Sequence, residues 1–309
     1  MNLRGCAVVL VVVALALVAA TPLVSAQPAP RAHQRGVHAL DTSGDHPLTT
    51  VASYTGQMDV AVVGVPVDGS ASPAGTFNLS GMPTGAAIQA AWVVIIDYSG
   101  ATDASLTFGG TSVGDVPPTY VDPGYPLEVW RFDVTSLVTG NGAYSFATVG
   151  PLQCYGVALV VVFSHTSLPI QQIVINMGAE DLENASSTTS FAGFTLPGAG
   201  RLIVFTGADD TSTDVGESLA FNGVTIPGVT FHENLGPVTS LITSSVTVQA
   251  GTNTATATTG DDQFGWALAI VAASAEPPIP AASHLGLALL AVAIAAFAVL
   301  LLVRRSSAA

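Results

Sequence analysis

The residues of this chain best suited to binding a metal ion form one acidic run, Asp209-Asp210-Thr211-Ser212-Thr213-Asp214-Val215-Gly216-Glu217. Carboxylate and hydroxyl oxygens on alternate residues are ligands that Ca²⁺ accepts. The sequence therefore presents Asp209, Asp210, Asp214 and Glu217 as candidate calcium ligands and indicates no other cofactor. The run departs from the EF-hand pattern, because Gly216 stands one place too late when the loop is counted from Asp210. The alternative interpretation is a solvated loop between two strands.

A second candidate site consists of aromatic residues beside a proline-rich stretch. Tyr120, Tyr125 and Trp130 lie in or next to this stretch, where prolines interrupt strand pairing and rings can stay exposed. An exposed aromatic ring combines an apolar face with a polar edge, which suits stacking on a sugar or a peptide. These three residues are therefore the candidate ligand residues.

One segment has the spacing of a hydrolase nucleophile. Gly110-Thr111-Ser112-Val113-Gly114 fits the G-x-S-x-G pattern, which requires a strand, a sharp turn and then a helix. Pro117 and Pro118 follow closely, and prolines do not fit a helix interior. We interpret the segment as a glycine-rich β-turn. No spacing joins Ser112 to His165 or to an aspartate, so we name no catalytic residue and predict that the protein is not an enzyme.

The composition excludes several classes of protein. Of the 309 residues, 49% are hydrophobic, and seven Arg with no Lys stand against 21 Asp and Glu, for a net charge of −14. A basic face that neutralises the phosphates of a nucleic acid is excluded. The apolar content excludes disorder throughout the chain. The two cysteines are too few for a disulfide framework or a cysteine zinc cluster.

The N-terminus has the layout of a secretory signal peptide over residues 1–26. Arg4 supplies a positive start, an apolar run follows from Cys6 to Ala20, and Ala26 ends a small-residue cleavage site. The alternative is an uncleaved signal anchor. Removal of Cys6 with the signal would leave Cys154 as the mature chain's lone thiol, which we expect in the core.

The C-terminus predicts one transmembrane helix over residues 285–303. This stretch has no charge and no proline, and as a helix it is about 28 Å long, close to the thickness of the hydrocarbon core. Arg304 and Arg305 follow at once. By the positive-inside rule they keep the short tail, residues 304–309, in the cytoplasm. The region before the helix is then exported and lies outside the cell membrane.

The approach to this helix, a proline-rich hinge over residues 276–284, resembles a known sorting signal. The hinge, the apolar span and the arginine pair together resemble the bacterial IPTL-type C-terminal signals, relatives of exosortase-processed tails. The matching positions are Ile279, Pro280, Ser283, Gly286 and Leu287, followed by the basic pair Arg304 and Arg305. The departing positions are Ala281, Ala282, His284 and Leu285, where the family favours Thr, Leu, Glu and Trp.

The resemblance covers about 30 residues at the end of the chain. It implies a protein of the bacterial envelope whose tail is cut near the motif by a sorting peptidase and transferred to another anchor. The alternative is a plain membrane anchor that stays on the protein.

The residues between these ends predict an all-β ectodomain. A leader over residues 27–52 is rich in Pro, Ala, His and Gly and reads as flexible. Beyond it, short runs of Val, Ile, Thr and Phe alternate with turn residues, and no long helical periodicity appears. Some of these runs are continuously apolar, which suits strands buried on both faces.

An internal repeat divides this region into two tandem β-sandwich-like domains, residues 53–165 and 166–275. Each has roughly the size of a single sandwich. Three blocks recur in the same order at offsets of 113, 111 and 109 residues, namely Ser105–Val113 with Ser218–Ile226, Gly140–Ser145 with Gly251–Thr256, and Gly156–Val161 with Gly265–Ile270.

Two functions remain open at this point. The first is a surface-displayed, membrane-anchored structural or adhesin-like protein of the bacterial envelope, whose partner is an unidentified surface protein or glycan. The alternative is a surface hydrolase or a carbohydrate-binding accessory protein. A repeated scaffold favours the first, because an enzyme with one site does not need a second copy of its fold.

Overall fold

The computed structural model describes residues 46–274 except 68, 123, 125, 151–152, 196, 208–215, 230, 232–238 and 261–262. The expected signal peptide, the hinge, the transmembrane helix, the tail and the leader up to residue 45 lie outside these residues. Within the described part, no helix has the length and apolar character needed to cross a membrane.

The described residues are built from β-strands, and the all-β prediction is confirmed. A short 3-10 turn, Thr135–Leu137, is their helical element. The strands are β1 (His46–Val65), β2 (Ala74–Leu79), β3 (Ala87–Asp97), β4 (Ala104–Phe108), β5 (Thr111–Val116), β6 (Tyr120–Val121), β7 (Glu128–Asp133), β8 (Gly142–Val149), β9 (Cys154–Ser164), β10 (Ile170–Glu183), β11 (Ser186–Phe194), β12 (Gly198–Gly207), β13 (Ser218–Phe221), β14 (Val224–Thr225), β15 (Thr239–Val248), β16 (Gly251–Thr258) and β17 (Gln263–Ser274).

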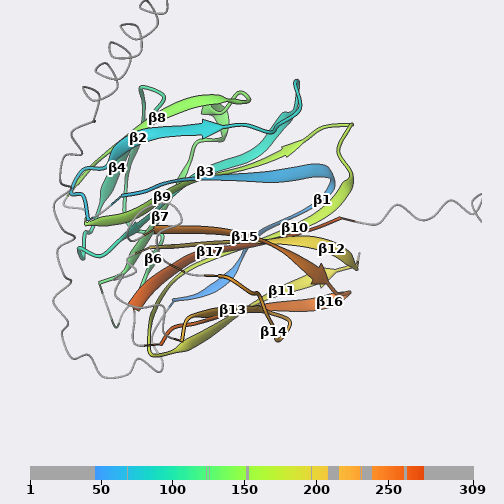
Figure 1. Ribbon diagram of the computed structural model, residues 1–309. Coiled ribbons are helices and arrows are strands. Elements are labelled where there is room, and N and C mark those ends of the chain that lie inside the picture. The colour runs from blue at the N-terminus through green and yellow to red at the C-terminus, as the bar shows by residue number, and fades with distance from the viewer. Residues whose placement is uncertain are drawn as a thin grey trace, which may run out of the picture. The chain divides into compact units, whose positions relative to one another are not determined.

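The strands form four layers, which Figure 1 shows stacked from top to bottom. The upper outer sheet has the order β2-β8-β4-β5, and the lower outer sheet has the order β11-β16-β13-β14. Between them, nine strands are connected in the order β15-β12-β17-β10-β1-β9-β3-β7-β6. We call the part from β9 to β6 the upper central sheet and the part from β15 to β10 the lower central sheet.

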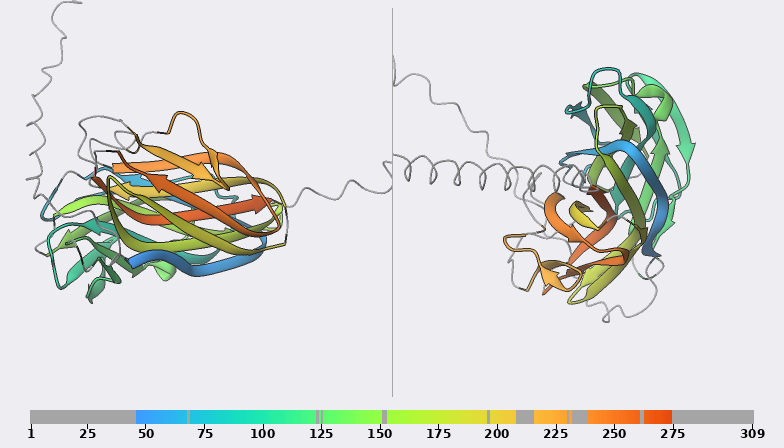
Figure 2. Two further views of the ribbon diagram at one scale, coloured as in Figure 1. Left: turned by 90° about the horizontal axis from the view of Figure 1, so that it is seen from below. Right: turned by 90° about the vertical axis from the view of Figure 1, so that its right-hand side faces the viewer.

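The long strand β1 connects the two central sheets. Its residues up to Gln57 pair with β10, and its residues from Met58 onward pair with β9. Figure 2 shows β1, in blue, curving from one half of the described region to the other. The two central sheets can therefore lie face to face although they share a strand.

Three hydrophobic cores fill the spaces between the four layers. The middle core joins residues of both central sheets, such as Val160 and Ile270. The upper core lies under the upper outer sheet and the lower core over the lower outer sheet. On β9, Val160 faces the middle core and Val161 the upper core, so this strand is buried on both faces. That burial explains why its sequence is a continuous apolar run rather than an alternating one.

The blocks of the internal repeat fall on corresponding strands of the two halves. The hairpin β4–β5 corresponds to β13–β14, β8 to β16, and β9 to β17. The chain passes from the first half to the second between Ser164 and Ile170. All described residues nevertheless lie in one compact unit. The halves share β1 and the middle core, so they pack against each other rather than following one another as separate beads.

The first strand begins earlier than expected. β1 starts at His46, inside the segment 27–52 that the sequence assigns to a flexible leader. Leu48 is buried in the lower core, and Gly178 of β10 leaves room for the chain, because a Cβ there would lie 2.5 Å from the carbonyl oxygen of His46. The composition of this segment hides the strand, since only a few of its residues contact the core.

Cys154 is a core residue, as the sequence predicts. It is a free thiol, fully buried at the start of β9, and its Sγ lies 3.6 Å from the carbonyl oxygen of Gly156. Burial raises the pKa of the thiol far above its usual range. The side chain therefore stays protonated and behaves as a small apolar group.

Candidate functional site

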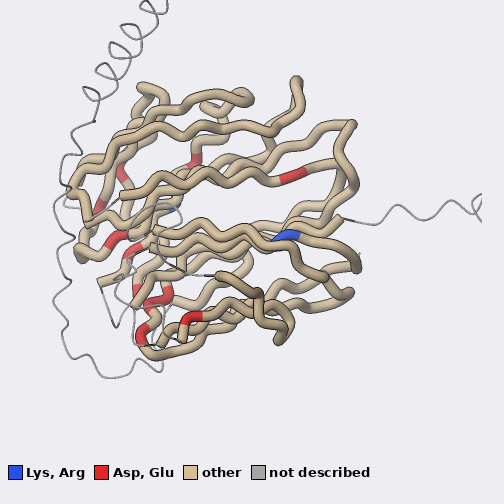
Figure 3. The backbone as a smooth tube through the Cα atoms, viewed as in Figure 1, with Lys and Arg blue, Asp and Glu red and all other residues tan. Residues whose placement is uncertain are grey.

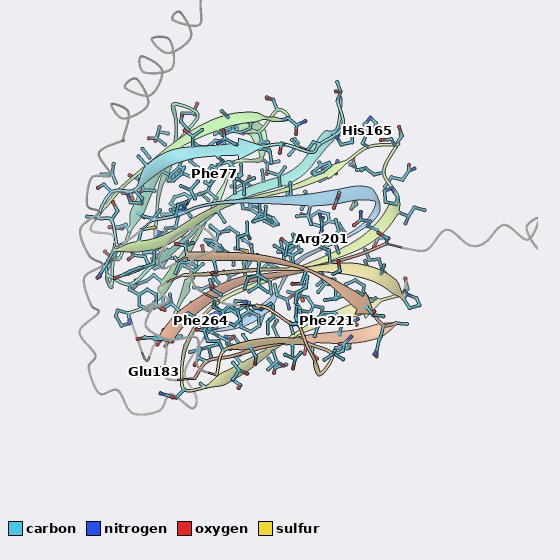
Figure 4. All side chains as sticks on the ribbon, in the orientation of Figure 1. Phe77, His165, Glu183, Arg201, Phe221 and Phe264 are labelled. Atoms are coloured by element: carbon cyan, nitrogen blue, oxygen red, sulfur yellow. The ribbon has the colours of Figure 1, made fainter. Side chains whose placement is uncertain are left out.

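A polar pocket lies where the chain passes from the first half to the second. Its volume is about 480 Å³, and it lies beside the turn between β9 and β10, the middle of β1 and the start of β3. Figure 4 labels His165 at this end of the strands. The pocket is lined by Gln57, Gly85, Ala87, Ser164, His165 and Thr166.

Hydrogen bonds hold the lining in place. Gln57 donates from Nε2 to the carbonyl oxygen of Thr166 at 3.0 Å and accepts the backbone N–H of His165 at 3.0 Å on its own carbonyl oxygen. Gln89 of β3 donates from Nε2 to Oγ of Ser164 at 2.9 Å. These bonds connect β1, β3 and the turn, so the pocket is pre-formed by the strands beneath it.

The ring of His165 has a defined role for one nitrogen. Its Nδ1 accepts the backbone N–H of Ser167 at 3.1 Å and lies 2.7 Å from Ser167 Oγ. In the neutral ring the proton is then on Nε2, which can donate to a ligand. The pocket thus offers a ring N–H, hydroxyls and an amide, and none of its lining residues is Asp, Glu or Arg. These groups suit a neutral, hydroxyl-bearing ligand.

The structure does not bring the residues of the hydrolase-like motif together. Ser112 is exposed in the hairpin β4–β5, where it pairs with Thr107. Among the described residues, no hydrogen bond joins it to a histidine. Asp133 caps the following 3-10 turn by accepting the N–H of Thr135 at 2.9 Å. No helix follows Ser112, in agreement with the prolines after it.

The structure corrects one of the predicted ligand residues. Trp130 is fully buried in the upper core, where its Nε1 donates to the carbonyl oxygen of Val116 at 3.2 Å, so it cannot stack on a surface ligand. Tyr120 of β6 is half-buried, and its ring meets His46 edge-on at 4.9 Å between centroids. Tyr125 lies outside the described residues. The proline-rich stretch hides the burial of Trp130, because β7 pairs with β3 immediately beyond it.

The predicted calcium and sorting residues fall mostly outside the described residues. This holds for Asp209, Asp210 and Asp214 and for the sorting positions Ile279, Pro280, Ser283, Gly286, Arg304 and Arg305. Glu217 is described, and its Oε2 accepts the backbone N–H of Phe231 at 3.1 Å. In the described ranges, no three His, Cys, Asp or Glu residues are placed to hold a metal ion.

The sequence gave no sign of a set of buried acids at the end of the strands opposite the pocket. Figure 3 shows acidic residues gathered toward that end, and Figure 4 labels Glu183 there. The ion pair of the described residues, Arg201 with Asp59 at 2.5 Å, lies elsewhere. The buried acids are Asp97, Asp122, Glu128, Glu180 and Asp181.

Two of these acids are neighbours on adjacent strands. Asp97 of β3 lies opposite Glu128 of β7. Ser99 donates from its backbone N–H to Asp97 at 3.0 Å, and Gly100 donates to Glu128 at 3.2 Å. Burial raises the pKa of Asp97. Burial, and then the charge of Asp97, raises the pKa of Glu128 to about 7. The pair therefore holds a proton near neutral pH.

A second group of acids joins the two halves. Tyr98 of β3 donates from its hydroxyl to Asp181 Oδ1 at 2.8 Å, and Gln263 donates to Oδ2 at 2.7 Å. Burial raises the pKa of Asp181 to about 7, with smaller contributions from Asp122 and Glu183. These acids end strands and look like solvated loop residues in the sequence. Only the stacking of the two central sheets covers them.

Comparison with known proteins identifies a family and no characterised relative. Residues 42–274 match the family model described as "Protein of unknown function (DUF3344)". No curated protein matches the sequence.

Three solved structures illustrate the level of structural similarity. A conserved protein of unknown function, PA5104 from Pseudomonas aeruginosa PAO1, is 11% identical, with a TM-score of 0.28 over 74% of this chain and 95% of that one. The β-porphyranase BpGH86A of glycoside hydrolase family 86 from Bacteroides plebeius is 10% identical, with a TM-score of 0.23 over 76% of this chain but only 37% of the hydrolase. The major capsid protein P2 of bacteriophage PM2 is 10% identical, with a TM-score of 0.21 over 70% and 98% of the two chains. These low TM-scores carry no conclusion about function.

Proposed function

Because the chain belongs to the DUF3344 family of proteins of unknown function, we propose a function from its own residues: a surface-displayed structural or adhesin-like protein of the bacterial envelope. Residues 1–26 would direct export, and residues 285–303 would anchor the β-rich region outside the membrane. The partner would be another surface protein or a glycan.

The observation that carries this proposal is the neutral exterior of the lower outer sheet. The strands β11, β16, β13 and β14 contain no Asp, Glu or Arg, although the chain has a net charge of −14. Hydroxyl groups form rungs across it, Ser186 with Thr258 at 2.8 Å and Thr188 with Thr256 at 2.8 Å. A broad face of hydroxyl and methyl groups supports contact with another surface more readily than turnover of a small substrate.

The scaffold beneath this face supports the same role. Strands of both central sheets are buried on their two faces, and three cores hold the layers together. The mature chain has no cysteine pair, so its rigidity comes from apolar burial, at roughly 25 cal/mol per Å². A stiff body of this kind can present a face at a distance from the membrane.

The topology can be tested in intact cells with an epitope tag after Ala309. External protease should digest the β-rich region and leave the tag on a short membrane-protected fragment, because the arginine pair holds the tail inside. Loss of the tag without added protease would support the alternative, a tail removed by a sorting peptidase. A full-length chain that protease reaches only after lysis would contradict export.

The pocket beside His165 supports a second candidate function, that of a carbohydrate-binding accessory protein. Its fixed, neutral hydrogen-bonding groups match the hydroxyls of a neutral sugar. Neutral oligosaccharides of glucose, galactose and N-acetylglucosamine are suitable probes, with binding to the full chain in detergent measured by calorimetry. We expect His165→Ala to weaken binding by roughly 3- to 10-fold, the effect of one neutral hydrogen bond.

The matched control for this experiment is His46→Ala, which removes an imidazole that does not line the pocket. Both variants should melt at the temperature of the parent protein. If no oligosaccharide binds, or if both variants bind as the parent does, the pocket is not a sugar site.

A further inference from the structure

The lower central sheet ends in a long, regular strand, β15. All ten of its residues pair with β12, from Thr239 opposite Gly207 to Val248 opposite Gly198, without a register shift. No described strand pairs with its other side. An edge strand carries unpaired N–H and C=O groups and is a template for another strand.

The other sheet edges are blunted by short or irregular strands. β6 and β14 have two residues each. β5 pairs irregularly with β4, and β11 has a bulge opposite β16. In the first half, β6 covers the outer side of β7. The free part of β15 begins beyond Leu241, which has a partner of its own.

The side chains of β15 do nothing to prevent pairing. Natural edge strands are protected by charged residues, above all lysine, and by proline. The stretch Thr239–Val248 has no charged residue and no proline, and the whole chain lacks lysine. Thr243, Ser245 and Thr247 are exposed. The nearby Arg201, opposite Ser245 on β12, is already neutralised by Asp59.

We propose that residues 243–248 of β15 pair antiparallel with the same residues of a second copy of this chain, extending the lower central sheet across a dimer. A second copy fits because a two-fold antiparallel contact places this segment opposite itself and closes the assembly. Its Thr, Ser and Val side chains form favourable cross-strand pairs with one another. An uncharged edge is also where two chains of net charge −14 approach with little repulsion.

Disulfide crosslinking of the full chain in its own membrane tests the contact. The variants are Thr243→Cys, Ser245→Cys and Thr247→Cys, made one at a time. In a two-fold antiparallel pair, the position on the axis meets its copy at a Cα separation of about 4.5 to 5.5 Å, which a disulfide can bridge. A position two residues away is separated from its own copy by about 13 Å. We therefore expect a dimer band at roughly twice the chain's mass, concentrated at one position.

The parent chain, whose Cys154 is buried, is the blank, and Thr188→Cys on the exposed face of β11 is the matched control. Neither should crosslink. Crosslinks to a species of another mass would overturn the choice of a second copy. Absence of a crosslink at all three positions would overturn the contact.

A second measurement uses charge instead of a crosslink. Ser245→Lys combined with Thr247→Lys should halve the mass of the full chain in detergent, measured by light scattering, because paired edges would bring like charges together. Thr188→Lys combined with Ser190→Lys places the same charges on β11 and should leave the dimer intact. Equal masses for the two lysine variants would contradict the proposal, and a normal melting temperature would exclude misfolding as the cause.

Discussion

Acidification from about pH 8 to about pH 5 should stabilise this protein by on the order of 3 kcal/mol through Asp181 alone. Burial raises the pKa of Asp181 to about 7 in the folded protein, whereas the unfolded chain exposes it. The folded state therefore binds the proton more tightly, and stability rises as the pH falls through 7. Glu128, whose pKa is also about 7, adds an effect of the same sign. Thermal unfolding of the full chain in detergent across this pH range measures the change.

The variant Asp181→Asn isolates this effect. It keeps the acceptor for Tyr98 and removes the charge, while the Gln263 amide can turn its oxygen toward the new NH₂ group. We expect the variant to match the parent at low pH and to be more stable at high pH. Asp115→Asn, at an exposed position of β5, should leave the pH dependence unchanged. A melting temperature that falls on acidification from pH 8 would show that these carboxyls are ionised and paired.

Replacing Asn176 by alanine should destabilise the protein by about 3 kcal/mol, because several buried polar groups lose their partner together. Asn176 of β10 is fully buried between the lower central and lower outer sheets. Its Nδ2 donates to Thr189 Oγ1 at 2.7 Å and to the carbonyl oxygen of Ser190 at 2.9 Å. Its Oδ1 accepts the hydroxyl of Thr50 at 2.8 Å. One amide thus connects β1, β10 and β11.

The matched control is Asn78→Ala, an exposed asparagine on the strand β2. Its loss should change the unfolding free energy by less than about 0.5 kcal/mol. Urea unfolding of the parent and the two variants separates these expectations. Equal effects for the two variants would mean that the polar connection through Asn176 contributes little to holding β1.

The sequence by itself determined the class of the fold and much of its organisation. Short β-prone runs between turn residues specify strands, and the continuous apolar runs around Val160 and Ile270 indicate strands buried on both faces. The repeated blocks fell on corresponding strands because equivalent positions need the same side-chain pattern. The burial of Cys154 followed from its being a lone thiol beside an apolar run. These properties are local, and a local pattern can report them.

Only the tertiary structure decided what covers each strand. An apolar run shows that both faces are buried but does not name the partner, so the stacking of the halves through β1 was not visible in the sequence. For the same reason Trp130 passed for a surface residue, and Asp97 and Asp181 for solvated ones. Burial of a strand end depends on a sheet contributed by residues far along the chain. The charge and hydrogen-bonding state of such groups is therefore set by packing, which no pattern within one segment contains.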